Sequence, residues 1–244
     1  LNNCIHIQYS NNLAEHSLQF NQLETAMSAT FLATHLLRSH AIKRWPLMHS
    51  IREETLSSHL ADVSMLGHLL GAVATDIHGY SEIDPDKVAA HCLWHEISES
   101  GGLGDINSKA KHADTAILKA LKAVEQHFEQ GALEMLPEPL RARYTPLICQ
   151  DKGEINAKVA KIADTFAALI KCQWEISRGN GVEFSAAKES LQEQIDVYAE
   201  KYDFVRTFIT LFLHEDITRI SVDEQMPRDW VKNTDAGKMK NAGN

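Results

Sequence analysis

Apolar residues recur at intervals of three and four along most of the chain, a spacing that predicts amphipathic helices. In the stretch MSATFLATHLLRSH, for example, one side of a helix collects Phe31, Leu32, Leu36 and Leu37. Alternating β-branched runs, which would predict paired strands, are not convincing anywhere. We therefore expect an all-α fold with helices over residues 28–40, 57–77, 85–100, 108–130, 137–149, 154–178, 184–200 and 202–214.

Capping residues support two of these helix starts. Asp84 precedes Pro85, and a capping side chain followed by a first-turn proline is a typical helix beginning. Asn107 or Ser108 can cap the helix that follows.

The chain divides into three parts by composition. Steady helical spacing begins at Met27, so we expect residues 1–26 to be an extension and Met27 to be the natural start. A genuine N-terminal helix in that segment is the alternative. Residues 27–220 form a single helical domain, because 244 residues with 44% hydrophobic content suffice for one sizeable core. Residues 221–244 form a polar C-terminal tail.

Charge narrows the class of partner. A formal net charge of -9 argues against broad binding of nucleic-acid polymers, which needs a basic surface. A small anionic substrate remains compatible with this net charge, since one metal ion and a few cationic side chains at a site outweigh the negative charge of the whole chain there.

Cysteine usage and hydropathy indicate the compartment. The 4 cysteines form no CxxC pair, so neither a zinc ribbon nor a disulfide framework is indicated. We see no apolar run near the roughly 20 residues that span a bilayer, and no signal-peptide layout. We expect a cytoplasmic protein without a membrane partner.

Candidate chemistry gathers in the stretch AAHCLWHEISESGGLGD, residues 89–105. If residues 85–100 are helical, His95 and Glu99 lie one turn apart on a common face and Glu96 lies beside them. An imidazole and two carboxylates then converge at the helix end. The alternative for such a cluster is a pair of solvated glutamates beside a structural histidine.

Two further residues favour a metal site. His59 lies near the start of a long apolar helix, and Asp164 lies among apolar residues of another, where a carboxylate is costly unless a cation meets it. Together with His95 and Glu96 they make a set of two nitrogen and two oxygen ligands from three helices. Such a set suits divalent Mn, Fe, Co or Zn, and Mg is a further option.

The order of five short motifs resembles a known family. KRWPLM, REETLSSH, WHEISE, GD and KIAD follow one another as in the HD-domain phosphohydrolases, and are most similar to the bacterial 5′-deoxynucleotidases and their phage relatives. The resemblance covers roughly residues 28–215. It implies an all-helical domain with one divalent metal ion held between helices.

The resemblance also implies roles for individual residues. The metal ligands are His59, His95, Glu96 and Asp164, and Glu99 works with the attacking water.

Other residues are implied on the substrate side. Asp105 matches the catalytic aspartate of the glycine-aspartate turn, and Arg44 and Trp45 match the RWP motif that contacts phosphate and sugar. Lys111 is a second candidate cation for the phosphate. A surface salt bridge for Arg44 and a packing role for Trp45 are the alternatives.

This chain departs from the family pattern in three places. The family's His-Asp pair is His95-Glu96 here, which is one methylene longer. The first histidine stands in Ser58-His59-Leu60 where close relatives have Glu-His-Ser, and the GDINSKAK turn lacks their prolines. These departures leave metal affinity and preference open.

The resemblance predicts a metal-dependent hydrolase that removes the 5′-phosphate from deoxyribonucleoside 5′-monophosphates. A deoxynucleoside triphosphohydrolase acting on dATP, or a noncatalytic nucleotide-binding protein, are the alternatives. The resemblance also implies a homodimer, for which the helical C-terminal half is a plausible interface.

Overall fold

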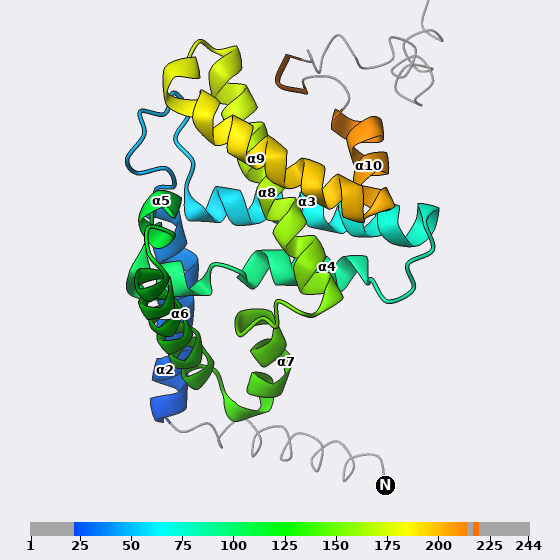
Figure 1. Cartoon of the computed structure of the whole chain (residues 1–244). Helices are drawn as coiled ribbons and strands as arrows, with labels where there is room; N and C mark the ends of the chain where they lie inside the picture. The colour runs from blue at the N-terminus through cyan, green and yellow to red at the C-terminus, as the bar shows by residue number, and fades with distance from the viewer. Residues whose placement is uncertain (1–21, 214–216, 220–244) are drawn as a thin grey trace, which may run out of the picture.

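A computed structural model describes residues 22–213 and 217–219, and its regular structure is helical throughout (Figure 1). Among these residues the only β pairing is an isolated bridge between Lys43 and Thr55. The predicted all-α fold class is thereby confirmed. The helices are α2 (Gln22–Leu32), α3 (Leu56–Ala72), α4 (Pro85–Trp94), α5 (Ser108–Lys111), α6 (Thr115–Met135), α7 (Glu138–Ile148), α8 (Ile155–Ser177), α9 (Gly181–Lys201) and α10 (Asp203–Phe208). The shorter π or 3₁₀ turns are η1 (Ala33–Leu37), η2 (Arg38–His40), η3 (Val73–Ile77), η4 (Glu99–Leu103), η5 (Ile209–Leu213) and η6 (Ile217–Arg219).

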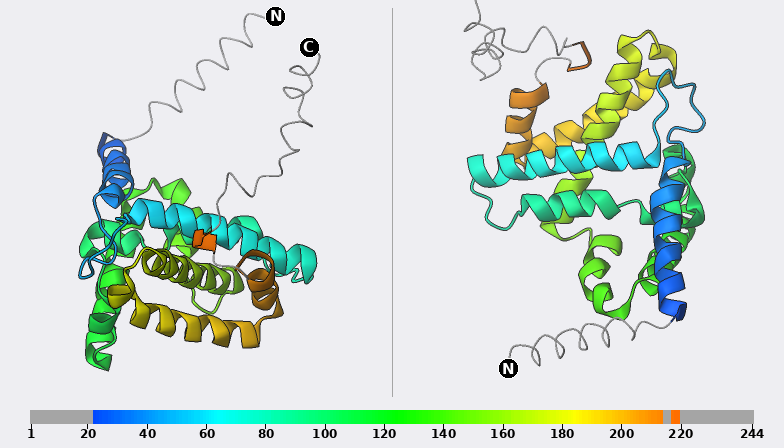
Figure 2. Two further views of the ribbon diagram at one scale, coloured as in Figure 1. Left: turned by 90° about the horizontal axis from the view of Figure 1, so that it is seen from above. Right: turned by 180° about the vertical axis from the view of Figure 1, so that it is seen from behind.

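The main core lies where α3, α4 and α8 pack together, with α9 and α10 covering α8 and α3 (Figures 1 and 2). Gly67 permits close contact between α3 and α4, because a Cβ at this position would lie 2.4 Å from Cys92 Sγ. This approach brings the helix that carries His59 next to the helix that precedes His95. The core includes Val63, Leu70, Val88, Cys92, Val159, Ile162, Phe166, Ile195, Phe204 and Phe208.

A second apolar cluster supports the other side of the site. It joins Phe31 of α2 and Ile97 to residues of α6 and α7, and Trp94 packs against it. Trp94 makes an edge contact with Tyr144, their ring centroids being 5.3 Å apart. The end of α4 and the segment after it are thus held between α2, α6 and α7.

Several helix boundaries agree with the sequence and several do not. Asp84 caps α4 with Pro85 in the first turn, and Asn107 caps α5, as predicted. The helix predicted over 108–130 is interrupted, because α5 ends at Lys111 and Asp114 caps a new helix, α6.

The predicted helix over 85–100 is interrupted at His95 and Glu96 and resumes at residues 97–98. α4 ends at Trp94, and the π turn η4 begins at Glu99. His95 and Glu96 therefore lie in a turn rather than on a helix face.

The N-terminal boundary differs from expectation as well. α2 begins at Gln22, so Met27 lies inside a helix rather than at its start. Residues 1–21 and the polar tail over 221–244 lie outside the described residues.

One helical run, Leu56–Ile77, is long and apolar enough to cross a membrane by length and composition, contrary to our expectation. One such run is weak evidence for a span, because core helices of the same length pass the same test. This run packs against α4 and α8 and buries His59, Val63 and Leu70, which is typical of a core helix.

Candidate metal centre

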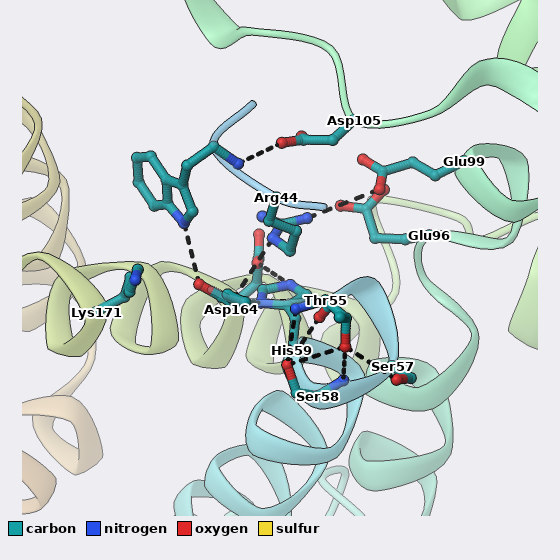
Figure 3. Close-up of polar contacts among 12 residues, drawn as sticks. Arg44, Thr55, Ser57, Ser58, His59, Glu96, Glu99, Asp105, Asp164 and Lys171 are labelled. Atoms are coloured by element: carbon teal, nitrogen blue, oxygen red, sulfur yellow. Dashed lines mark hydrogen bonds and ion pairs between the residues drawn. The ribbon is translucent and has the colours of Figure 1, made fainter. Parts of the chain in front are cut away.

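His59 is placed by the way α3 begins. Thr55 caps the helix and accepts a hydrogen bond from the Ser58 amide, while the Ser58 hydroxyl accepts one from the Thr55 amide (Figure 3). This reciprocal pair is a capping box. Ser58 stands where close relatives have glutamate. By closing the capping box it stabilises the first turn of α3, and His59 follows it directly. The His59 side chain is 1% exposed and lies in the core.

His95 and Glu96 follow the last residue of α4. His95 Nδ1 lies 2.6 Å from the carbonyl oxygen of Cys92, so this nitrogen donates to the main chain and Nε2 is the ring nitrogen that faces Glu96 and Asp164. Glu96 Oε1 lies 3.5 Å from His95 Nε2. The longer side chain therefore reaches the histidine from the turn.

Three side chains point their ligand atoms at one small region. The atoms of His59, His95 and Glu96 lie within 4.8 Å of one another. Asp164 Oδ1 adds a fourth, at 3.1 Å from His59 Nε2 and 3.6 Å from His95 Nε2. Both Nε2 atoms are buried without a hydrogen-bond partner. Two imidazole nitrogens and two carboxylate oxygens in this arrangement fit a divalent transition ion.

Asp164 is a buried carboxylate that is paired with cationic side chains, because an unpaired charge in apolar surroundings is costly. Lys161, one helical turn earlier on α8, lies 2.6 Å from its Oδ2 and leaves Oδ1 facing the histidines. Burial alone would raise the pKa of Asp164. Lys161, His59 and His95 outweigh that effect and hold the pKa well below its usual value.

Glu54 is a site residue that the sequence did not reveal. Its Oε1 lies 3.1 Å from His59 Nδ1, and its Oε2 accepts a hydrogen bond of 3.1 Å from Trp45 Nε1. A carboxylate on the second nitrogen of a ligating histidine fixes the ring and raises its basicity. Glu54 thus joins the candidate metal ligand His59 to the candidate substrate residue Trp45.

Glu54→Gln is expected to weaken divalent-metal affinity by about 10–100-fold, because the oriented imidazole loses its charged partner. Metal titration by calorimetry measures the change. The matched control is Glu53→Gln, since Glu53 is an exposed neighbour paired with Lys43. Equal affinities in both variants would show that Glu54 does not support the metal.

The turn after Glu96 carries Glu99 and ends at Asp105. Gly102 and Gly104 have φ values of 154° and 71°, which favour glycine and redirect the chain after Glu99. Burial and the charges of Glu96, Asp105 and Asp164 raise the pKa of Glu99 to about 9, although Arg44 opposes them. Without a metal ion, Glu99 therefore holds a proton at neutral pH.

Two residues near the N-terminus hold this turn in place. His35 Nδ1 lies 2.8 Å from Ser100 Oγ, and Arg38 donates to the carbonyl oxygens of Ser100 and Gly101. The turn bearing Glu99 is therefore attached to η1 and η2. No pattern in the sequence predicts this contact, which joins positions more than 60 residues apart.

Arg44 lies among the acidic side chains (Figure 3). Its Nη1 is 3.9 Å from Glu99 Oε2, and its Nε and Nη1 are buried without a hydrogen-bond partner. Burial lowers the pKa of Arg44, but the surrounding carboxylates of Glu96, Asp164, Glu99 and Asp105 outweigh it, so the pKa is raised. The guanidinium is charged and has free donors for an anion.

Trp45 is held in an unusual backbone conformation. Its φ is 58°, a left-handed value that is strained for a bulky residue. The carboxylate of Asp105 accepts a hydrogen bond of 2.8 Å from the Trp45 main-chain amide. The Trp45 ring packs against the buried ring of Phe184, with 5.5 Å between the two centroids. Asp105 and Trp45, far apart in sequence, are thus directly joined.

Lys111 lies on the short helix α5. Its ammonium nitrogen is 2.5 Å from Glu125 Oε1 of α6, so its charge is neutralised within the protein. Lys111 is thus paired with Glu125 and does not lie among the carboxylates that surround Arg44.

Metal binding is expected to release about one to two protons at about pH 6, so affinity should rise with pH. Burial and Arg44 lower the pKa of His59, but Asp164 and Glu54 outweigh them and raise it above the usual value, so the ring carries a proton that a metal must displace. The raised pKa of Glu99 adds a second proton, which a nearby dication displaces.

Calorimetry in buffers of different ionisation enthalpy counts the protons. The Glu99→Gln variant should release about one fewer than the wild type. Metal binding without any proton release would contradict this description of the metal-free site.

Structural comparison gives the fold. The chain is similar to the crystal structure of an HD-domain phosphohydrolase from Listeria innocua, with a TM-score of 0.65 over 78% of this chain and 90% of that chain at 22% identity, so the two share a fold.

Sequence comparison then gives the family. Residues 30–215 match the YfbR-like family, described as 5′-deoxynucleotidase YfbR-like, and the chain belongs to it. The 5′-deoxynucleotidases YfbR of Salmonella paratyphi B and Salmonella newport are each 30% identical over 202 residues, which cover 82% of this chain and 100% of the relative. The family implies a nucleotide substrate and a divalent metal, for which His59, His95 and Glu96 are the candidate group.

Proposed function

We propose that the protein is a divalent-metal-dependent phosphohydrolase that converts deoxyribonucleoside 5′-monophosphates to deoxynucleosides and phosphate. The observation that carries the proposal is the pair of buried Nε2 atoms of His59 and His95, which have no hydrogen-bond partner and lie within ion-pair distance of Asp164 and Glu96, beside a charged arginine. An ion held there would lower the pKa of bound water and polarise a phosphoryl oxygen.

The remaining roles follow from where the side chains lie. Arg44 binds the phosphate through its free guanidinium donors. Glu99, 3.9 Å from Arg44, orients the attacking water and accepts its proton once a nearby cation has lowered its pKa. Asp105 holds Trp45 through one oxygen and, in this proposal, serves the nucleophile or the leaving 5′ oxygen with the other. Trp45 packs against the sugar.

An assay panel tests the proposal. Deoxynucleoside and ribonucleoside monophosphates and deoxynucleoside triphosphates are offered with Mn, Co, Fe, Zn or Mg, and the product is identified. We expect phosphate from the deoxynucleoside monophosphates. Release of triphosphate from dATP would establish triphosphohydrolase activity instead, and no hydrolysis under any condition would favour a noncatalytic protein.

The same panel examines sugar selectivity. We expect the wild type to prefer dAMP to AMP, because Trp45 is held between Asp105, Glu54 and Phe184 and has little freedom to make room for a 2′ hydroxyl.

Glu96→Asp is expected to change the order of metal preference. The shorter side chain draws the carboxylate back from His95 Nε2, now 3.5 Å from Glu96 Oε1, so the ion-to-ligand distances change. Titration of Mn, Co and Zn into both proteins measures the effect. Identical affinities for all three ions would show that Glu96 is not a ligand.

A further inference from the structure

The segment between η2 and α3 carries Arg44, Trp45 and Glu54 but has little regular structure. Its β pairing is the isolated bridge between Lys43 and Thr55 near its two ends. The chain between them needs other contacts to keep the substrate-side residues in place.

Glu175 provides such contacts from α8. Its side chain is 0% exposed, and its carboxylate accepts hydrogen bonds from the amides of Ile51 at 2.9 Å and Arg52 at 3.1 Å. Lys171 and Asn180 donate to the same carboxylate at 2.5 Å and 2.8 Å. A buried carboxylate with four donors is fully satisfied and holds all of its partners firmly.

The partners of Glu175 bind the segment a second time. Lys171 donates to the carbonyl oxygen of Arg52, and Asn180 donates to that of His49 at 2.7 Å. The main chain of residues 49–52 is therefore attached, through both its amides and its carbonyls, to α8 and to Asn180, the residue directly before α9.

The same helix carries the candidate metal ligand Asp164. Figure 3 shows Asp164 and Lys171 on α8, and Glu175 follows one turn after Lys171. Glu175 is roughly 16 Å from Asp164 along the helix axis, too far to reach the ion. α8 thus holds the metal side of the site at one position and the substrate-side segment at another.

We propose that Glu175 is a positioning residue for substrate: it holds residues 49–52 on α8 and thereby sets Arg44 and Trp45 at the correct distance from the ion held by Asp164. This rests on the proposed function, because it assigns Arg44 and Trp45 to the substrate. Substrate binding depends on the attachment more strongly than metal binding, which the same segment supports through the contact of Glu54 with His59.

Glu175→Gln keeps the shape of the side chain but removes the charge that holds the amides. KM for dAMP is expected to rise by about 10-fold or more, since small displacements of binding groups are costly. We expect kcat to change less than about 3-fold, and metal affinity to fall by less than KM rises, because Glu54 keeps its own contact with His59. Glu154→Gln is the matched control. The Glu154 carboxylate also accepts a hydrogen bond from a main-chain amide, that of Ala157 at the opposite end of α8.

Two measurements separate positioning from loss of folding. A partly unfolded preparation lowers apparent kcat and leaves KM unchanged, the reverse of the expected split. In a cycle with Arg44→Ala, the combined loss of kcat/KM should be smaller than the product of the single losses, since Glu175 acts through that segment.

Asn180→Ala provides a second, milder variant if Glu175→Gln does not fold. It removes one donor to Glu175 and the bond to His49, so KM should rise by about 3-fold with kcat retained. Unchanged KM in both variants, with an active wild type, overturns the positioning proposal alone. A wild type inactive on every nucleotide overturns the proposed function.

Discussion

Replacing Glu99 by glutamine is expected to lower kcat for dAMP by about 10³-fold while the protein still binds its divalent ion. Glu99 is buried beside Arg44 and the other carboxylates, and its pKa is raised to about 9 in the metal-free protein. A cation bound nearby would lower this pKa and allow the carboxylate to accept a proton. Glutamine has nearly the same shape but cannot accept the proton.

Glu129→Gln is the control for this substitution. Burial raises the pKa of Glu129 too, but this residue lies on α6 outside the group of candidate ligands. Its replacement should change kcat far less than Glu99→Gln does, because Glu129 interacts with the site through the charge of Glu96 but is neither a candidate ligand nor a candidate base. If Glu99→Gln retained full activity with metal bound, Glu99 would not be the proton acceptor.

Asp164→Asn is expected to reduce metal affinity by more than the roughly 10–100-fold that loss of a supporting group causes, and to abolish hydrolysis with it. Asp164 Oδ1 lies within 3.6 Å of both histidine Nε2 atoms. The amide of asparagine lacks the charge that offsets the dication. Excess metal should restore part of the activity.

Asp62→Asn provides a comparison for Asp164. Asp62 is a half-buried aspartate on α3, three residues after His59, and burial raises its pKa. Its replacement should lower metal affinity far less than Asp164→Asn does, because Asp62 interacts electrostatically with His59 and Glu54 but is not a candidate ligand. If the two variants bound metal equally well, Asp164 would not be a ligand, and the ion would need a different set of donors.

The sequence predicted the helices where apolar spacing and capping agree. The run from Val159 to Phe166 required a long helix, and α8 spans Ile155–Ser177. The end of α4 was missed because the apolar spacing continues to Ile97. In the structure His95 Nδ1 donates to the Cys92 carbonyl, the acceptor that the Glu96 amide would use in a continuing helix.

Residues that support the site were predicted less well. Lys161 precedes Asp164 by three positions, so this pairing on one helix face was readable from the sequence. Glu175 and Asn180 contact the irregular segment from more than 120 residues away, and Glu54 lies within that segment, outside any helix. Periodicity carries no signal for such contacts.

The central claim is that His59, His95, Glu96 and Asp164 hold one ion. Mn²⁺ titration of the metal-free wild type and of the His59→Ala/His95→Ala double variant tests it most directly, with paramagnetic resonance detecting free Mn²⁺. We expect one tightly bound ion per chain in the wild type and none in the double variant, which lacks both Nε2 donors. Equal binding by the two proteins would contradict the assignment of this site.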